Sequence, residues 1–113
     1  PANLVMVLNE DPVAAVYTLR EHIRHTHAKD GVQLRPCDPV QVYAAFAEGG
    51  IAGLNIGELF NELPLGEGAV DWDRYLQALS QIGYRGYLTI EREVGENPEA
   101  DIAAAVKFLQ SRI

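Results

Sequence analysis

The sequence predicts an α/β fold in which short parallel strands are covered by helices. Three helix-start signals support this prediction, because Asp11-Pro12, Asp38-Pro39 and Asn97-Pro98 each place a capping side chain before a proline at the first helical position. Two short apolar segments between the helices have the length and composition of strands. The resulting order of helix, strand, loop, helix, strand and helix is typical of an α/β architecture with parallel strands.

Hydrophobic spacing defines the helices that follow these signals. The helices starting at Pro12 and Pro39 place apolar residues on one face, and the helix starting at Pro98 carries acids in its first turn, where the helix dipole favours them. A fourth helix has the clearest pattern, because Asp71 can cap it and Gly83 can end it. Its apolar residues recur at helical intervals: Trp72, Tyr75, Leu76, Leu79 and Ile82.

The two predicted strands are residues 23–29 and residues 87–91, and the second can continue to Glu93. A further strand is expected to end just ahead of Pro1. Residues 49–70 are rich in glycine and irregular in pattern. They predict a long functional loop, with a small hairpin at residues 54–63.

Composition narrows the class of protein. The chain has 113 residues, which allows one domain at most or part of one. Its net charge of −7, from 16 acidic and 9 basic residues, argues against a nucleic-acid partner, because phosphate backbones are bound mainly by Lys and Arg. No apolar run is long enough to predict a membrane span. The single Cys37 cannot form an internal disulfide, so we expect a cytoplasmic protein.

The densest group of potential ligands is the segment His25-Thr26-His27-Ala28-Lys29-Asp30. Alternate side chains of a strand share a face, so His25, His27 and Lys29 are expected to point one way. The small residues Thr26 and Ala28 would then lie under a covering helix. Two interpretations of the histidines remain open: a metal site, or a pair of hydrogen-bonded core histidines.

A second group lies at the end of the other strand, where Thr89, Glu91 and Glu93 share a face. Carboxylates at the carboxyl ends of parallel strands are where barrel enzymes keep their active residues. The alternative is a surface ion pair with a nearby Arg or with Lys29. The pattern favours the ion pair for Glu93 and decides nothing for Glu91.

Several segments, taken in order, resemble one family. They are Pro1-Ala2-Asn3-Leu4, Asp11-Pro12, the residues 23–30 with His25 and His27, the residues 63–72, and the residues 83–91. Together they resemble the xylose-isomerase-like sugar phosphate isomerase/epimerase family, which includes ketose 3-epimerases, inosose dehydratases and hydroxypyruvate isomerases. The resemblance implies the C-terminal part of a (β/α)8 TIM barrel, about its last two to three βα units, from just after the sixth strand to the final helix.

The resemblance also implies a metal site. In this family a divalent cation (Mn²⁺, Mg²⁺, Co²⁺ or Zn²⁺) is held by two Glu, one Asp and one His, and two of these positions fall on His27 and Glu91. The Asp would stand one residue ahead of Pro1, and the other Glu further upstream. Glu91 would also transfer the proton, and Asn3, His25 and Lys29 would bind substrate. Some epimerases carry an Arg near Gln33, which leaves the substrate open.

The expected activity is therefore isomerisation or epimerisation of a small-molecule sugar or sugar phosphate. The chain is too short to close a barrel, so we expect either a homo-oligomer or a missing N-terminal portion of the barrel. The isolated chain is expected to be inactive. Two alternatives stay open: a metal-dependent dehydratase or lyase of the same barrel family, and an inactive truncated fragment that folds by oligomerisation. Apurinic endonucleases of the same barrel family are disfavoured by the negative charge.

Overall fold

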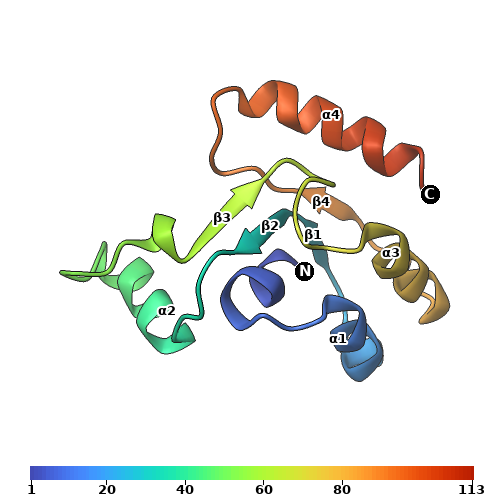
Figure 1. Ribbon diagram of the computed structural model, residues 1–113. Coiled ribbons are helices and arrows are strands. Elements are labelled where there is room, and N and C mark those ends of the chain that lie inside the picture. Colours follow the sequence, from blue (N-terminus) through green and yellow to red (C-terminus); the bar gives the residue numbers. More distant parts are fainter.

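A computed structural model describes residues 1–113 and has the predicted α/β organisation (Figure 1). Four α-helices and four short strands are joined by loops and three short helical turns. In chain order the elements are a π-helix at Leu4–Leu8, α1 at Pro12–Leu19, a 3-10 turn at Arg20–His22, β1 at Thr26–Ala28, β2 at Asp30–Gln33, α2 at Pro39–Glu48, a 3-10 turn at Ile56–Glu58, β3 at Phe60–Leu63, α3 at Trp72–Gln81, β4 at Leu88–Ile90 and α4 at Pro98–Gln110.

The predicted helix starts are confirmed. Asp11 and Asp38 each accept a hydrogen bond of 2.9 Å from the amide two residues later, and the proline between them is the first helical residue. Asn97 caps α4 in the same way, through the amide of Ala100 at 3.1 Å. Asp71 caps α3, and Gly83 just beyond that helix has a φ of 75°, a conformation that glycine adopts at little cost. None of these helices is both long and apolar enough to cross a membrane.

The first strand pair confirms the predicted parallel arrangement. β1 pairs with β4 so that Thr26 lies opposite Leu88, His27 opposite Thr89 and Ala28 opposite Ile90. The pairing covers fewer residues than the predicted strands 23–29 and 87–91. Residues 23–25 have no partner strand, and β4 offers only three residues to pair with.

The predicted hairpin at residues 54–63 is wrong. β3 does lie at the end of this segment, but its antiparallel partner is β2, with Asp30 opposite Leu63 and Gln33 opposite Phe60. Only Lys29 separates β1 from β2, so residues 26–33 form one extended stretch that pairs first with β4 and then with β3. The sequence did not predict β2, because Asp and Gly are poor strand formers.

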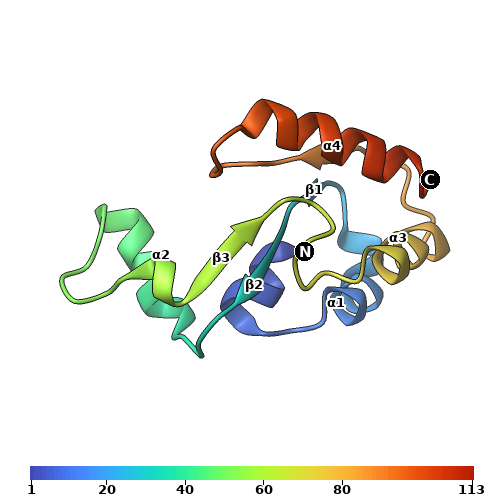
Figure 2. The ribbon, with the colours of Figure 1, turned by 45° about the horizontal axis from the view of Figure 1, so that its top comes forward.

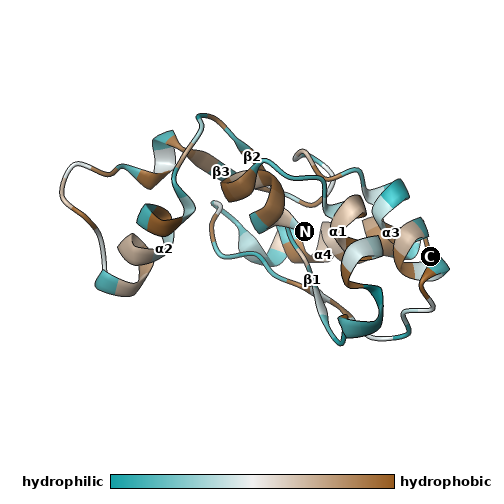
Figure 3. Cartoon of the chain, turned by 90° about the horizontal axis from the view of Figure 1, so that it is seen from below, coloured by the Kyte–Doolittle hydropathy of each residue, from teal (hydrophilic) through white to brown (hydrophobic).

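A short helix at the start of the chain was also unexpected. Residues 2–3 are helical and continue into the π-helix, which ends at Asn9 with a left-handed φ of 53°. Its residues Val5, Met6 and Val7 are buried. Figure 3 shows it as one of the most hydrophobic segments of the chain, between α1 and α2.

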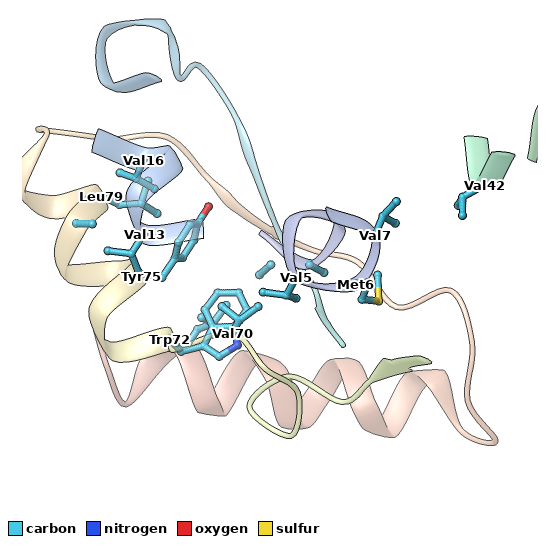
Figure 4. Close-up of a cluster of buried hydrophobic side chains, with 14 residues drawn as sticks. Val5, Met6, Val7, Val13, Val16, Val42, Val70, Trp72, Tyr75 and Leu79 are labelled. Atoms are coloured by element: carbon cyan, nitrogen blue, oxygen red, sulfur yellow. The ribbon is translucent and has the colours of Figure 1, made fainter. Parts of the chain in front are cut away.

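The helices divide between two sides of the β1–β4 pair. α1 and α3 lie side by side, and the Tyr17 hydroxyl donates a 2.6 Å hydrogen bond to Gln81 between them (Figures 1 and 2). α4 runs along β4 on the other side. The core contains the inward residues of α1 and α3, the short N-terminal helix and the buried side of β1 (Figure 4). Its largest side chains come from α3: Trp72, Tyr75 and Leu79.

Residues 34–59, with α2 and the second 3-10 turn, extend away from this core as an arm (Figures 1 and 2). The arm contributes to the elongated outline of 43 × 33 × 21 Å. Val42 of α2 is fully buried against the core, whereas Tyr43 and Phe46 on the same helix are 47% and 59% exposed. The arm therefore presents apolar side chains to the space beside the strands.

Asp30 links the strands to the loop that precedes α3. Its carboxylate is 1% exposed and accepts hydrogen bonds from four donors: the amides of Gly31, Gly66 and Val70, and the indole nitrogen of Trp72, at 2.8–3.2 Å. A side chain at Gly68 would collide with this carboxylate, so the loop approaches Asp30 closely. Asp30 is thus a structural residue, although the sequence grouped it with the potential ligands.

We expect Asp30→Ala to destabilise the protein by about 3 kcal/mol or more, because several buried donors would lose their only acceptor. Urea unfolding followed by Trp72 fluorescence measures this loss. Asp30→Asn keeps the size of the side chain and should fall between the two. Glu67→Ala removes an exposed acid from the same loop and serves as the control, with an expected change of about 0.5 kcal/mol or less. Equal stabilities of Asp30→Ala and Glu67→Ala would contradict this role.

Candidate active site

The register of the parallel strands brings the two predicted metal ligands together. The amide of Glu91 donates to the carbonyl of Ala28 at 3.0 Å, which extends the β1–β4 pairing one step past the end of β4. The Glu91 side chain then reaches His27, and Nδ1 of His27 lies 2.8 Å from Oε2 of Glu91. The two side chains are 51% and 32% exposed, so both remain accessible to a small molecule.

All five predicted site residues line one pocket of about 340 Å³. The pocket opens at the carboxyl ends of β1 and β4, where parallel-stranded barrels bind their substrates. The Asn3 side chain bonds to no amide of the helix that follows it. The residues predicted from sequence that line the pocket are Asn3, His25, His27, Lys29 and Glu91.

The two faces of β1 are divided as the sequence predicted. On the inner face, the Thr26 and Tyr75 hydroxyls share a 2.6 Å hydrogen bond, and Ala28 is fully buried. On the outer face, His25 and His27 meet edge to face with their ring centres 5.3 Å apart. Both histidines are exposed, so the interpretation as buried core histidines is wrong.

Lys29 is the buried cation of the site. Its ammonium lies 3.2 Å from Glu62 and 3.8 Å from Glu91, and it also contacts the Glu93 carboxylate, with only 10% of its side chain exposed. Burial lowers the Lys29 pKa, but the hydrogen bonds to Glu93 and Glu62 outweigh it, and the pKa is raised above its ordinary value. The predicted ion pair of Glu93 is thus confirmed, with Lys29 as its partner.

Glu62 joins Lys29 to a second buried cation. The Arg92 guanidinium lies 3.0 Å from Glu62 and 2.7 Å from Asp101 on α4, and the amide of Glu93 donates to Glu62 at 2.9 Å. Sequence reasoning missed Glu62 because it lies on β3, inside the segment predicted to be an irregular loop. Only the pairing of β3 with β2 brings it to the site.

Next to this network the molecule is hollowed again. A space of about 760 Å³ runs from His27, Lys29 and Glu91 toward the arm. Carboxylates lie at one end of this hollow, and aromatic side chains of the arm and of β3 lie at the other: Tyr43, Phe46 and Phe60. We call it the arm hollow.

The site offers part of a donor set for a metal. Imidazole nitrogen and carboxylate oxygen both bind divalent cations such as Mn²⁺ and Zn²⁺. His27 and Glu91 present these atoms to the same pocket, which fits two coordination positions. No group of three or more His, Cys, Asp or Glu side chains converges on one point in the structure. Further ligands would have to come from outside these residues.

The pH dependence of stability should reflect Glu62. Burial raises the pKa of Glu62, but bonds from the Glu93 amide, Arg92 and Lys29 outweigh it, so its pKa lies below the ordinary value of 4.5. The folded form therefore keeps Glu62 ionised at a pH where the unfolded chain binds a proton, and stability falls as the pH drops below about 4.5. We expect Glu62→Gln to weaken this fall in urea unfolding between pH 3 and pH 7. Glu48→Gln, which removes an exposed acid from α2, is the control, and identical curves for the two variants would exclude Glu62 as a source.

Comparison with known proteins fits this arrangement. L-ribulose-5-phosphate 3-epimerases UlaE of Salmonella paratyphi B and Salmonella typhi are 40% identical over 57 residues, which are 49% of this chain and 20% of theirs. A crystal structure of a xylose isomerase domain protein from Planctomyces limnophilus matches 98% of this chain with a TM-score of 0.70 and 29% identity. The chain spans 35% of that protein. Residues 1–112 match the family model described as xylose isomerase-like TIM barrel, and the chain belongs to this family.

Proposed function

We propose that this chain carries part of the active site of a metal-dependent sugar or sugar-phosphate isomerase or epimerase. The observation that supports the proposal best is the 2.8 Å approach of His27 Nδ1 and Glu91 Oε2 from adjacent parallel strands. The similarity to epimerases of a phosphorylated ketose supports the same class of reaction. Because the chain covers a third or less of the length of these relatives, the activity of the whole protein is part of the proposal.

His27 and Glu91 are proposed to hold a divalent cation. One imidazole among carboxylates suits Mn²⁺, Mg²⁺, Co²⁺ or Zn²⁺. When bound, such a cation would polarise neighbouring oxygens of a sugar and acidify the adjacent carbon. The remaining ligands would be supplied by residues outside this chain, either from another part of the barrel or from a partner copy.

Glu91 is proposed to move the proton. A carboxylate can remove a proton from the carbon next to a sugar carbonyl and return it to the neighbouring carbon or to the same one. The Lys29 ammonium, 3.8 Å from Oε1 of Glu91, favours the ionised form that can accept the proton. His25 and Asn3 line the same pocket and would hydrogen-bond sugar hydroxyls. Epimerisation also needs an acid or base on the opposite face of the carbon, which would come from outside this chain.

Metal binding should depend on both proposed ligands. In the full-length protein we expect His27→Ala and Glu91→Gln each to weaken Mn²⁺ binding by roughly tenfold or more, as measured by isothermal titration calorimetry. His22→Ala is the control, because His22 is exposed at the opposite end of β1, outside the pocket. Wild-type affinity in both ligand variants would refute the metal site, whatever the activity of the protein.

Activity should depend on Glu91. With Mn²⁺ present we expect Glu91→Gln to lower kcat on ketose substrates by roughly a hundredfold or more, and to abolish exchange of the substrate proton with solvent deuterium. Glu67→Gln, outside the pocket, should behave as the wild type. We expect residues 1–113 alone to be inactive, and robust turnover by this piece would contradict the proposed sharing of the site. A product lighter than the substrate by one water would favour the dehydratase alternative.

A further inference from the structure

The positive charges around the pocket are already neutralised. Lys29 contacts three carboxylates, those of Glu62, Glu91 and Glu93. Arg92 contacts Glu62 and Asp101. Four carboxylates thus surround two cations, so the network has an excess of negative charge before any substrate enters.

The other basic side chains lie elsewhere. Lys29 is the only Lys or Arg that lines either the pocket or the arm hollow. Arg35, on the arm, faces the Glu58 carboxylate at 3.8 Å. Arg112 is paired with Asp73 at the far end of α3. A phosphate group placed in either space would find no unpaired cation.

The loop after β4 is unsuited to phosphate as well. In barrel enzymes a phosphate site is often formed by the loops after the last two strands together with the start of a short helix. Here the segment after β4 carries Glu91, Glu93 and Glu96. The start of α4 has a proline without an amide hydrogen, and Asn97 and two acids already occupy the positive end of the helix dipole. This region repels an anion.

The arm hollow offers a different kind of contact. Its volume of about 760 Å³ is sufficient for a monosaccharide. The half-exposed rings of Tyr43 and Phe46 line the hollow, opposite the carboxylates and the Lys29 ammonium. Aromatic faces carry partial negative charge and attract the polarised C–H groups of a sugar, whereas carboxylates accept hydrogen bonds from its hydroxyls.

We propose that the site accepts a free, uncharged sugar and discriminates against its phosphate ester. The inference rests on the proposed function and narrows its substrate class. The carboxylates around Lys29 exclude a dianionic ester by charge repulsion, and the aromatic side of the arm hollow receives the carbon skeleton of the neutral sugar. Glu93 is the determinant on the edge of the site, because it is exposed and occupies the Lys29 charge that a phosphate would need.

The test compares matched pairs of sugars on the full-length protein with Mn²⁺: L-ribulose with its 5-phosphate, and D-fructose with its 6-phosphate. Affinity is measured by calorimetry and turnover by product analysis, so that binding and chemistry are read separately. We expect the free sugar of at least one pair to bind roughly tenfold or more tightly than its ester, because placing like charges together is unfavourable. Inorganic phosphate at millimolar concentration should not compete.

The outcomes separate this inference from the proposed function. Tighter binding of the free sugar without turnover supports the inference and refutes the isomerase proposal. Equal or tighter binding of the ester overturns the inference, even if turnover confirms the isomerase. Absence of binding by all four sugars overturns both.

A charge variant tests the physical cause. Glu93→Gln should release part of the Lys29 charge and lower the preference for the free sugar severalfold. Glu96→Gln removes the same charge from the same loop, but Glu96 makes no ion pair and does not line the arm hollow, so the preference should stay at the wild-type value. An unchanged preference in Glu93→Gln would show that the network does not cause the discrimination and would overturn the inference.

Discussion

The parallel pairing of β1 with β4 is the constraint on which the rest of the structure depends. It is only three residues long, yet it fixes both faces of the molecule at once. A slip of one residue would exchange the two faces, turning His27 into the core and Ala28 toward solvent. The register is held because burial favours one solution: Ala28 is fully buried, and Thr26 shares a hydrogen bond with Tyr75 of α3. The contact between His27 and Glu91 is a consequence of this packing.

Two neighbouring residues extend the same division past the end of β1. Lys29 faces the pocket and neutralises its carboxylates, whereas Asp30 faces the opposite way and binds the loop before α3. Each is a buried charge, and each is compensated by its surroundings: Lys29 by ion pairs, and Asp30 by four hydrogen-bond donors. One unbroken stretch of backbone therefore carries the anchor of the site and the anchor of the fold, so strain in one is transmitted directly to the other.

Local signals were sufficient to predict the helices and the two principal site residues. Each capping side chain acts on an amide two or three residues away, and alternation along a strand assigned His27 and Glu91 to one face. The pairing of β3 with β2 could not be predicted in this way, because it joins segments about thirty residues apart and its register is set by tertiary burial rather than by propensity. Glu62 and the true role of Asp30 both depend on that pairing. The short N-terminal helix escaped prediction because no side chain caps its start.

The antiparallel extension of β1 into β2 has a consequence for how such a site diverges. Residues 34–59 leave and re-enter the body of the molecule through two hydrogen-bonded strands that lie next to each other. A segment anchored at adjacent points can be lengthened, shortened or exchanged with little effect on the frame beneath it. New sugar preferences could therefore evolve, or be engineered, by grafting a different insert at this stem while the imidazole and the carboxylate stay where they are.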